Sequence, residues 1–262
     1  MNRHWRNMTP SSLKKGKQMI EDLIHNCKKL KLRAFTENIE LTLAMASQKN
    51  WPTLKVIEHL VDLESDLRRK NRIDRCFKQS GLCAPTTIDQ FDFGHHASRK
   101  KQKNKILDLL HLEFIQQKKD VILIGNPGVG KSFLAKSIAY AATQAGIKTL
   151  FVTAMDMINH LITAEADQSL LKKLHYYQSQ NLLVVDEIGY LSLSQEGSDL
   201  FFQVISKRHE KNSTIVTTNQ PFAEWGKIFN NTTVATAIAD RLVYRSEVLI
   251  LEGKSYRKRK SG

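Results

Sequence analysis

Short apolar runs alternate with longer segments that carry apolar residues at helical spacing along the second half of the chain. The short runs predict buried strands near 121–124, 148–152, 181–186, 214–218 and 247–251. The longer segments predict helices near 131–145, 155–163, 167–177, 196–210 and 233–243. Strands that alternate with helices form a parallel sheet with crossover helices. We therefore expect an α/β domain with a five-stranded parallel sheet.

The first half of the chain shows mainly the helical pattern. Apolar residues spaced at three and four predict helices near 19–31 and 33–48, and a third that follows Pro52 and continues to Arg75. A further amphipathic helix is expected near 106–116. We divide the chain into a basic flexible arm (1–18), a small all-helical N-terminal domain (19–80), a linker and basic segment (81–105) and the α/β domain (106–262).

Positive charge is concentrated in the flanks of the chain, whose net charge is +14 over 262 residues. Residues 1–119 hold 24 Lys and Arg against 13 Asp and Glu, whereas residues 120–262 hold 16 against 13. The basic runs Arg68–Arg72 and Arg99–Lys105 are either solvated surface or contacts for phosphate. Such a distribution suits a polyanion such as DNA or RNA, although an ordinary basic surface also binds nucleic acid weakly.

Several features indicate the compartment. No stretch has the length of an apolar membrane span, and residues 1–17 lack the apolar core of a secretory signal. The three cysteines are widely spaced and show no metal-binding pattern, which is typical of free thiols in a reducing cytosol. We expect a cytoplasmic protein without a membrane partner.

The segment Gly125–Ser132 fits the phosphate-binding pattern G-x-x-x-x-G-K-[ST]. It lies between a predicted strand and a predicted helix, which is the context that this loop requires. Backbone N–H groups of the loop and the helix N-terminus would hold an anion. Lys131 would reach the β- and γ-phosphates, and the Ser132 hydroxyl would bind Mg²⁺. The predicted nucleotide-binding set is Gly125, Asn126, Pro127, Gly128, Val129, Gly130, Lys131, Ser132 and Phe133.

Two acidic residues end the predicted strand at 181–186. In a P-loop ATPase the first, Asp186, holds the metal through its water shell, and the second, Glu187, is placed to act as general base. The alternative is a strand that simply ends in polar residues. Asn219 ends the next strand, and parallel strands place their carboxyl ends on one edge of the sheet. Asn219 is therefore expected near the γ-phosphate, although Asn also commonly ends strands as a turn residue.

Two other features leave alternatives open. Arg241 and Arg257 could each stabilise the charge that develops in phosphoryl transfer, one of them in a neighbouring subunit, or could form surface ion pairs. The segment Thr87–Phe93 packs either beside a nucleotide base or in the core, and core packing is the slightly better interpretation.

Taken together, these motifs resemble the IstB family of AAA+ ATP-binding helper proteins of insertion-sequence transposition, which is similar to the DnaC-type helicase loaders. The segments that carry the resemblance are Leu30–Arg33, Phe91–Phe93, Gly125–Ser132, Leu182–Glu187, Arg208–Glu210, Thr217–Asn219, Trp225–Gly226, Ala237–Leu242 and Gly253–Arg257. Ser132 replaces a common Thr. His209 replaces a common Tyr, which leaves the role of Arg208 open.

The resemblance implies an AAA+ fold, an ATPase that uses ATP and Mg²⁺, and a bacterial, nucleoid-associated protein. Because the chain stops shortly after Arg257, we expect no full lid domain. The resemblance matches Asn219 to the sensor-1 residue, Arg241 to an arginine finger acting in trans and Arg257 to the sensor-2 residue. It further implies a homo-oligomer that binds duplex DNA with little sequence preference and activates a partner transposase. The alternatives are a DnaC-type loader of a replicative helicase and a nucleotide-gated protein-interaction module without a DNA role.

Overall fold

The computed structural model describes residues 10–190 and 192–256. The chain divides into two compact units between Arg72 and Ile73, before the expected boundary at 80. The reason is that the third helix, α3 (Thr53–Gln79), does not end with the first unit. Its last turns pack in the second unit, where the Phe77 ring lies 5.7 Å from the ring of Tyr140.

The first unit consists of α1 (Pro10–Lys29), α2 (Arg33–Lys49) and most of α3. The expected flexible arm over 1–18 is wrong for residues 10–18, which form the first turns of α1. Proline fits the first turn of a helix, where its missing N–H is not needed. A hydrogen bond of 3.0 Å from Gln18 to Asp22 also supports the helical conformation of this segment.

A buried carboxylate joins α3 to the start of α2. One oxygen of Glu64 accepts a hydrogen bond from the backbone N–H of Ala34 at 2.8 Å, and the other accepts from Arg68 Nε at 2.7 Å. Burial by itself would raise the pKa of Glu64, but these hydrogen bonds outweigh it and hold the pKa below its usual value. Glu64 therefore supplies an acceptor to an N-terminus whose own N-cap, Leu32, offers no side-chain bond.

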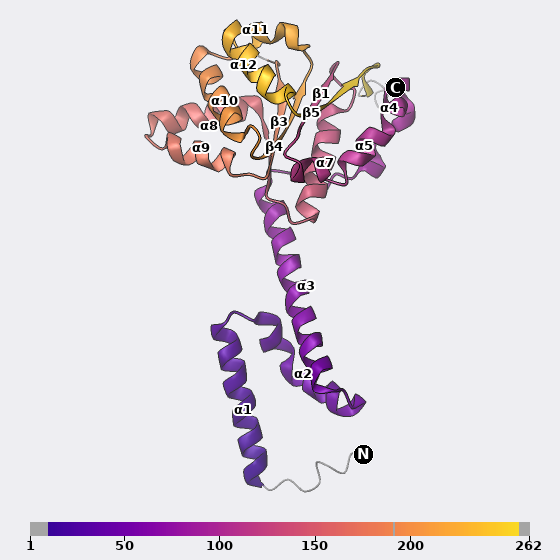
Figure 1. Cartoon of the computed structure of the whole chain (residues 1–262), viewed down its shortest axis with the longest axis vertical. Coiled ribbons are helices and arrows are strands. Elements are labelled where there is room, and N and C mark those ends of the chain that lie inside the picture. The colour runs from indigo at the N-terminus through magenta and orange to yellow at the C-terminus, as the bar shows by residue number, and fades with distance from the viewer. Residues whose placement is uncertain (1–9, 191, 257–262) are drawn as a thin grey trace. The chain divides into compact units, whose positions relative to one another are not determined.

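The second unit contains the predicted five-stranded parallel sheet, in the order β2-β3-β4-β1-β5 (Figure 1). The strands are β1 (Asp120–Gly125), β2 (Thr149–Thr153), β3 (Leu182–Ile188), β4 (Ser213–Thr218) and β5 (Ser246–Leu251). All five expected strands are confirmed. The order places β3, β4 and β1 side by side, so their carboxyl ends meet in the middle of one edge.

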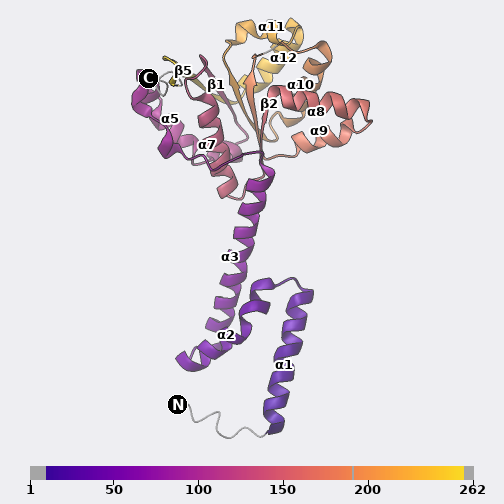
Figure 2. The same ribbon diagram turned by 180° about the vertical axis from the view of Figure 1, so that it is seen from behind.

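Strand residues alternate between two apolar cores, one on each face of the sheet. Leu183 and Val185 of β3 belong to the core under α8 (Ala154–Ala166), α9 (Leu170–Gln178), α10 (Gln195–Arg208) and α12 (Thr232–Val243). Leu182 and Val184 belong to the core under α7 (Lys131–Gln144). Figure 2 shows α7 on one side of the strands and α8 with α10 on the other. Burial on both faces explains the continuous apolar strand sequences.

Residues before β1 form part of the second unit and do not act as a linker. Leu82, Ile88, Phe91 and Phe93 pack in or against the core under α7. The expected helix near 106–116 is broken at Leu112, whose φ is 63°. The short elements of the second unit are η2 (Ile88–Gln90), η3 (Phe93–His95), α4 (Ala97–Lys101), α5 (Lys103–Leu109), α6 (Glu113–Gln116), η4 (Phe222–Glu224) and α11 (Trp225–Ile228).

Two expectations from composition can be compared with the structure. The three cysteines, Cys27, Cys76 and Cys83, are free thiols. Within residues 10–190 and 192–256, none of the helices is both long and apolar enough to span a lipid bilayer.

Candidate nucleotide-binding site

The loop between β1 and α7 surrounds a lysine at a helix N-terminus. Lys131 is the first residue of α7, and Gly130 before it has a φ of 101°. A Cβ atom at Gly130 would lie 2.7 Å from Phe91 Cε2, so the turn has no room for a side chain. The Lys131 ammonium donates to the carbonyl oxygens of Gly125 (2.7 Å) and Asn126 (3.0 Å). A cation and a helix N-terminus at one loop form an arrangement that binds anions.

A hydroxyl and a carboxylate from two elements lie together beside this loop. Ser132 Oγ, in the first turn of α7, donates to Asp186 Oδ1 at 3.0 Å. Asp186 is buried near the end of β3, and its Oδ1 also accepts from Thr217 Oγ1 of β4. The structure thus brings the two predicted metal ligands into contact.

The donor set fits Mg²⁺ bound together with a substrate. Among the described residues, no group of three or more His, Cys, Asp and Glu side chains could hold a metal ion. Mg²⁺ does not need such a group, because it usually binds through one or two protein oxygens, several waters and substrate phosphates. Ser132 and Asp186 supply oxygen ligands of this kind.

Glu187 lies at a bulge in β3. The pairing of β3 with β4 passes from Val185–Val216 directly to Ile188–Thr218, so that two residues of β3 oppose one residue of β4. Glu187 takes a left-handed conformation with a φ of 64°, which is uncommon for a residue with a side chain. Its N–H donates to Thr217 Oγ1 at 2.9 Å. The bulge leaves the Glu187 side chain exposed at the edge, next to the buried Asp186.

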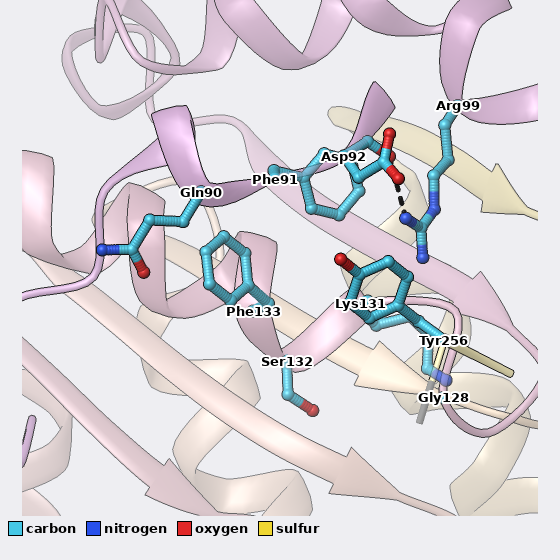
Figure 3. Close-up of a pocket in the computed structure, with 10 residues that line it drawn as sticks. Gln90, Phe91, Asp92, Arg99, Gly128, Lys131, Ser132, Phe133 and Tyr256 are labelled. Carbon is cyan, nitrogen blue, oxygen red and sulfur yellow. Dashed lines mark hydrogen bonds between the residues drawn. The ribbon is translucent and has the colours of Figure 1, made fainter. Parts of the chain in front are cut away.

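Two cavities meet at the loop. The first has a volume of 420 Å³, within the range of small-molecule sites, and is lined by Gln90, Phe91, Asp92, Arg99, Gly128, Gly130, Lys131, Ser132, Phe133 and Tyr256. Figure 3 shows the side chains that line this cavity, among them the rings of Phe91, Phe133 and Tyr256. The second, smaller cavity is lined by Pro127, Gly128, Lys131, Ser132, Glu187, Tyr190, Thr217, Thr218 and Asn219. Predicted residues from the ends of β1, β3 and β4 therefore share one site.

One predicted arginine, Arg241, is not part of this arrangement. Arg241 of α12 lines neither cavity of its own chain. Its guanidinium donates to the carbonyl oxygen of Ala237 at 2.9 Å and lies 4.6 Å from the centre of the Phe202 ring. Arg257 lies outside the described residues.

Sequence reasoning assigned no site role to Thr217 or Arg99. Thr217 contacts both acidic residues of the site, and its position near the end of β4, two residues before Asn219, was an available signal. Arg99 lies in a run of lysines, where nothing in the sequence distinguishes it, yet it is only 2% exposed and lines the larger cavity. Burial lowers the pKa of Arg99. Gln90, Phe91 and Asp92 also line this cavity, whereas Ile88, Phe91 and Phe93 pack in or against the core under α7, as the core-packing interpretation of Thr87–Phe93 predicts.

Arg208 has a structural role far from the cavities. Its guanidinium is buried and donates to Thr214 Oγ1 and to the carbonyl oxygens of Tyr177, Gln178, Gln180 and Ser213. These contacts join the end of α9 to the starts of β3 and β4. Burial lowers the pKa of Arg208 to about 9 and raises that of the neighbouring Asp120 to about 7. The neighbouring His209 forms no hydrogen bond with these groups. Its Nδ1 atom lies 3.1 Å from the Arg241 carbonyl oxygen.

The chain is similar to known ATP-binding proteins. The family model described as IstB-like ATP binding protein matches residues 25–262. The ATP-binding protein of insertion sequence IS232 from Bacillus thuringiensis subsp. berliner is 34% identical, over 92% of this chain and 96% of that protein. The ATP-binding protein of insertion sequence IS5376 from Geobacillus stearothermophilus is 36% identical, over 92% and 95% respectively.

Solved structures share the fold of the second unit. The DnaC helicase loader aligns with a TM-score of 0.53 at 22% identity, over 63% of this chain and 96% of that chain. AMPPCP-bound DnaA from Aquifex aeolicus aligns with a TM-score of 0.57 at 16% identity, over 69% and 56%. At such identities the likeness shows the fold alone, which is the α/β P-loop fold of AAA+ proteins.

Proposed function

Because this chain belongs to the family of IstB-like ATP-binding proteins and is an ATPase of the AAA+ type, we propose that it is an ATP-dependent helper protein of insertion-sequence transposition. In this proposal it assembles with ATP on duplex DNA with little sequence preference, and there recruits or activates a partner transposase. Hydrolysis then resets the assembly. The match to insertion-sequence proteins along almost the whole of both chains is the observation that carries the proposal.

The proposed nucleotide contacts follow from the meeting of three strands. The P-loop residues Gly125–Phe133 bind the phosphates, and Lys131 exchanges its loop carbonyls for phosphate oxygens. Ser132 and Asp186 hold Mg²⁺, which when bound neutralises phosphate charge. The contact between Ser132 Oγ and Asp186 Oδ1 supports this assignment, because both oxygens already face the same point beside the loop.

We assign proton abstraction from water to Glu187. Its neighbour Asp186 is buried and occupied by two hydroxyl donors, whereas the Glu187 carboxylate is exposed at the edge of the smaller cavity. The left-handed backbone at Glu187 supports a functional role, because strained residues of this kind gather at active sites. Asn219 lines the same cavity and would orient the water.

Arg241 is proposed to act in the site of a neighbouring copy. It lies on Phe202 outside both cavities of its own chain, so that a role in catalysis requires a second subunit. A guanidinium supplied in trans makes hydrolysis depend on assembly. Such an arginine raises the rate of phosphoryl transfer by about 10³–10⁵-fold. Arg257, outside the described residues, remains a proposed sensor-2 residue.

The basic flank is the proposed DNA contact. Exposed lysine and arginine side chains of the first unit include Lys28, Lys29, Lys31, Arg33, Arg68, Arg69 and Lys70. A protein that holds duplex DNA through phosphate contacts binds less tightly as salt rises, in proportion to the number of contacts. A role on DNA would place the protein at the bacterial nucleoid.

The substitution Glu187→Gln tests the proposal, because it keeps the size and the polar character of the side chain but removes the base. The variant should bind ATP as the wild type does, fail to hydrolyse it, and accumulate an ATP-dependent oligomer on duplex DNA. Lys131→Ala, which should not bind ATP, is the matched negative control. Normal turnover by Glu187→Gln would reject Glu187 as the base.

Two outcomes would favour the alternatives. Co-purification of a hexameric replicative helicase and no transposase would favour a helicase loader. DNA binding that is weak and insensitive to salt in the presence of ATP would favour a protein-interaction module without a DNA role. The transposition proposal requires salt-sensitive DNA binding together with recovery of a transposase.

A further inference from the structure

One arginine within a lysine-rich segment is buried against the P-loop. Arg99 lies in α4 and is 2% exposed, whereas the adjacent Lys100 and Lys101 are exposed. A buried guanidinium loses its hydration, so its position must be fixed by specific contacts. Arg99 lines the larger cavity together with Phe91, Asp92 and Tyr256 (Figure 3).

The Arg99 guanidinium joins three separate segments. Its Nη2 donates to the Val129 carbonyl oxygen of the P-loop at 2.6 Å, and its Nη1 donates to the Asp92 carbonyl oxygen at 2.9 Å. Its centre lies 4.6 Å from the Phe91 ring and 5.5 Å from the Tyr256 ring. The planar fork of an arginine can make two directed hydrogen bonds while its flat face contacts aromatic rings, which a lysine cannot do.

Residues of α4 and of the preceding η3 contact the segment that follows β5, residues 252–256. Ser98 Oγ donates to the Glu252 carbonyl oxygen at 3.0 Å, and His95 Nε2 lies 3.1 Å from the Lys254 carbonyl oxygen. That segment also touches the P-loop directly, because the Tyr256 N–H donates to the Gly128 carbonyl oxygen at 2.9 Å. The P-loop is therefore held from both sides, by residues that precede β1 and residues that follow β5.

The geometry points to Arg99 as a positioning residue for ATP binding, which fixes the Val129 turn of the P-loop and holds Phe91 and Tyr256 as walls of the cavity. This inference rests on the proposed nucleotide site. Arg99 makes no contact with Ser132, Asp186 or Glu187 in the structure, so it acts on the binding of ATP and not on the hydrolytic step.

Arg99→Met is the main test, with Lys100→Met as the matched control on the same helix. Met is long and unbranched but forms neither of the two hydrogen bonds. We expect the dissociation constant and KM for ATP to rise about tenfold, as the loss of one or two charged hydrogen bonds implies. We expect kcat to stay within about twofold, because the hydrolytic groups are untouched. Lys100→Met should bind ATP as the wild type does.

Two further variants separate positioning from a general loss of structure. Arg99→Lys keeps the charge without the fork and should recover only part of the affinity. Tyr256→Leu removes one wall and should weaken ATP binding less in the Arg99→Met background than in the wild type, because the two residues are coupled. If Arg99→Met does not fold, Arg99→Lys and the single variant Tyr256→Leu decide the matter: each should weaken ATP binding at unchanged kcat, and wild-type ATP affinity in both would overturn the inference.

Each outcome has a defined meaning. Equal ATP affinity in Arg99→Met and the wild type, additive effects with Tyr256→Leu, or a fall in kcat at unchanged KM would overturn the inference. In those cases the wild type still binds ATP and only the role of Arg99 is lost. Failure of the wild type and Lys100→Met to bind ATP would instead reject the proposed nucleotide site itself.

Discussion

The hydroxyl of Thr217 is the link between the two acidic residues of the site, and its removal provides a sharp test. Thr217 is fully buried in β4; its Oγ1 donates to Asp186 Oδ1 and accepts from the Glu187 N–H. Thr217→Val keeps the shape of the side chain but removes both hydrogen bonds. The Glu187 N–H would lose its acceptor, whereas Asp186 would still accept from Ser132.

The size of the effect follows from these contacts. A buried donor left without an acceptor costs about 1–3 kcal/mol of folding free energy. In a unit of this size each kcal/mol lowers the unfolding midpoint by about 2–4 °C. Groups that orient metal ligands typically contribute about 10–100-fold to metal affinity or activity. Thr217→Val should therefore show a lower midpoint and a larger Mg²⁺ requirement for ATP hydrolysis.

Thr217→Ser separates the hydroxyl from the rest of the side chain. It loses a methyl group, which costs about 1 kcal/mol when buried, but it keeps both hydrogen bonds. Calorimetry measures the midpoint, and hydrolysis assays over a range of Mg²⁺ concentrations measure the metal requirement. The reasoning would be refuted by wild-type hydrolysis in Thr217→Val, or by an equally large rise in the Mg²⁺ requirement of Thr217→Ser.

Three further predictions concern buried ionisable side chains. Arg208→Met removes the guanidinium that joins α9 to β3 and β4, and should lower the free energy of unfolding by about 3–5 kcal/mol in urea titrations; an unchanged midpoint would contradict its structural role. Because the pKa of Asp120 is raised to about 7, the wild type should lose stability from about pH 4 to pH 7, by up to about 1.4 kcal/mol per pH unit. Asp120→Asn should flatten that dependence. The lowered pKa of Glu64 means that its contribution is present near neutral pH and is lost on acidification; Glu64→Gln should reduce helix content by circular dichroism near pH 7 and match the wild type in acid.

The sequence was sufficient to predict the elements of the α/β unit, because burial on both faces of a parallel sheet leaves continuous apolar runs. The same patterns located the P-loop and the acidic residues at the end of β3, since each belongs to the end of one element. The pairing of Ser132 with Asp186 also followed, because parallel strands bring their carboxyl ends together.

Features that depend on one tertiary contact could not be predicted. Arg99 and Lys100 are equivalent in sequence, and only the position of the P-loop decides which is buried. The left-handed backbone of Glu187 results from a bulge whose register depends on β4. Helix α1 begins at Pro10, earlier than the apolar pattern predicts. Its first residues are mostly polar, and apolar periodicity does not mark the ends of an exposed helix.

The walls of the larger cavity are separated in the sequence by the entire sheet. Residues 90–99 precede β1, and Tyr256 follows β5. A polypeptide that emerges from the ribosome therefore exposes its P-loop well before it can close the cavity around a ligand. Nascent chains are expected not to bind cellular ATP until the segment after β5 has been translated, and copies that lack this segment would thereby be kept out of any nucleotide-dependent complex.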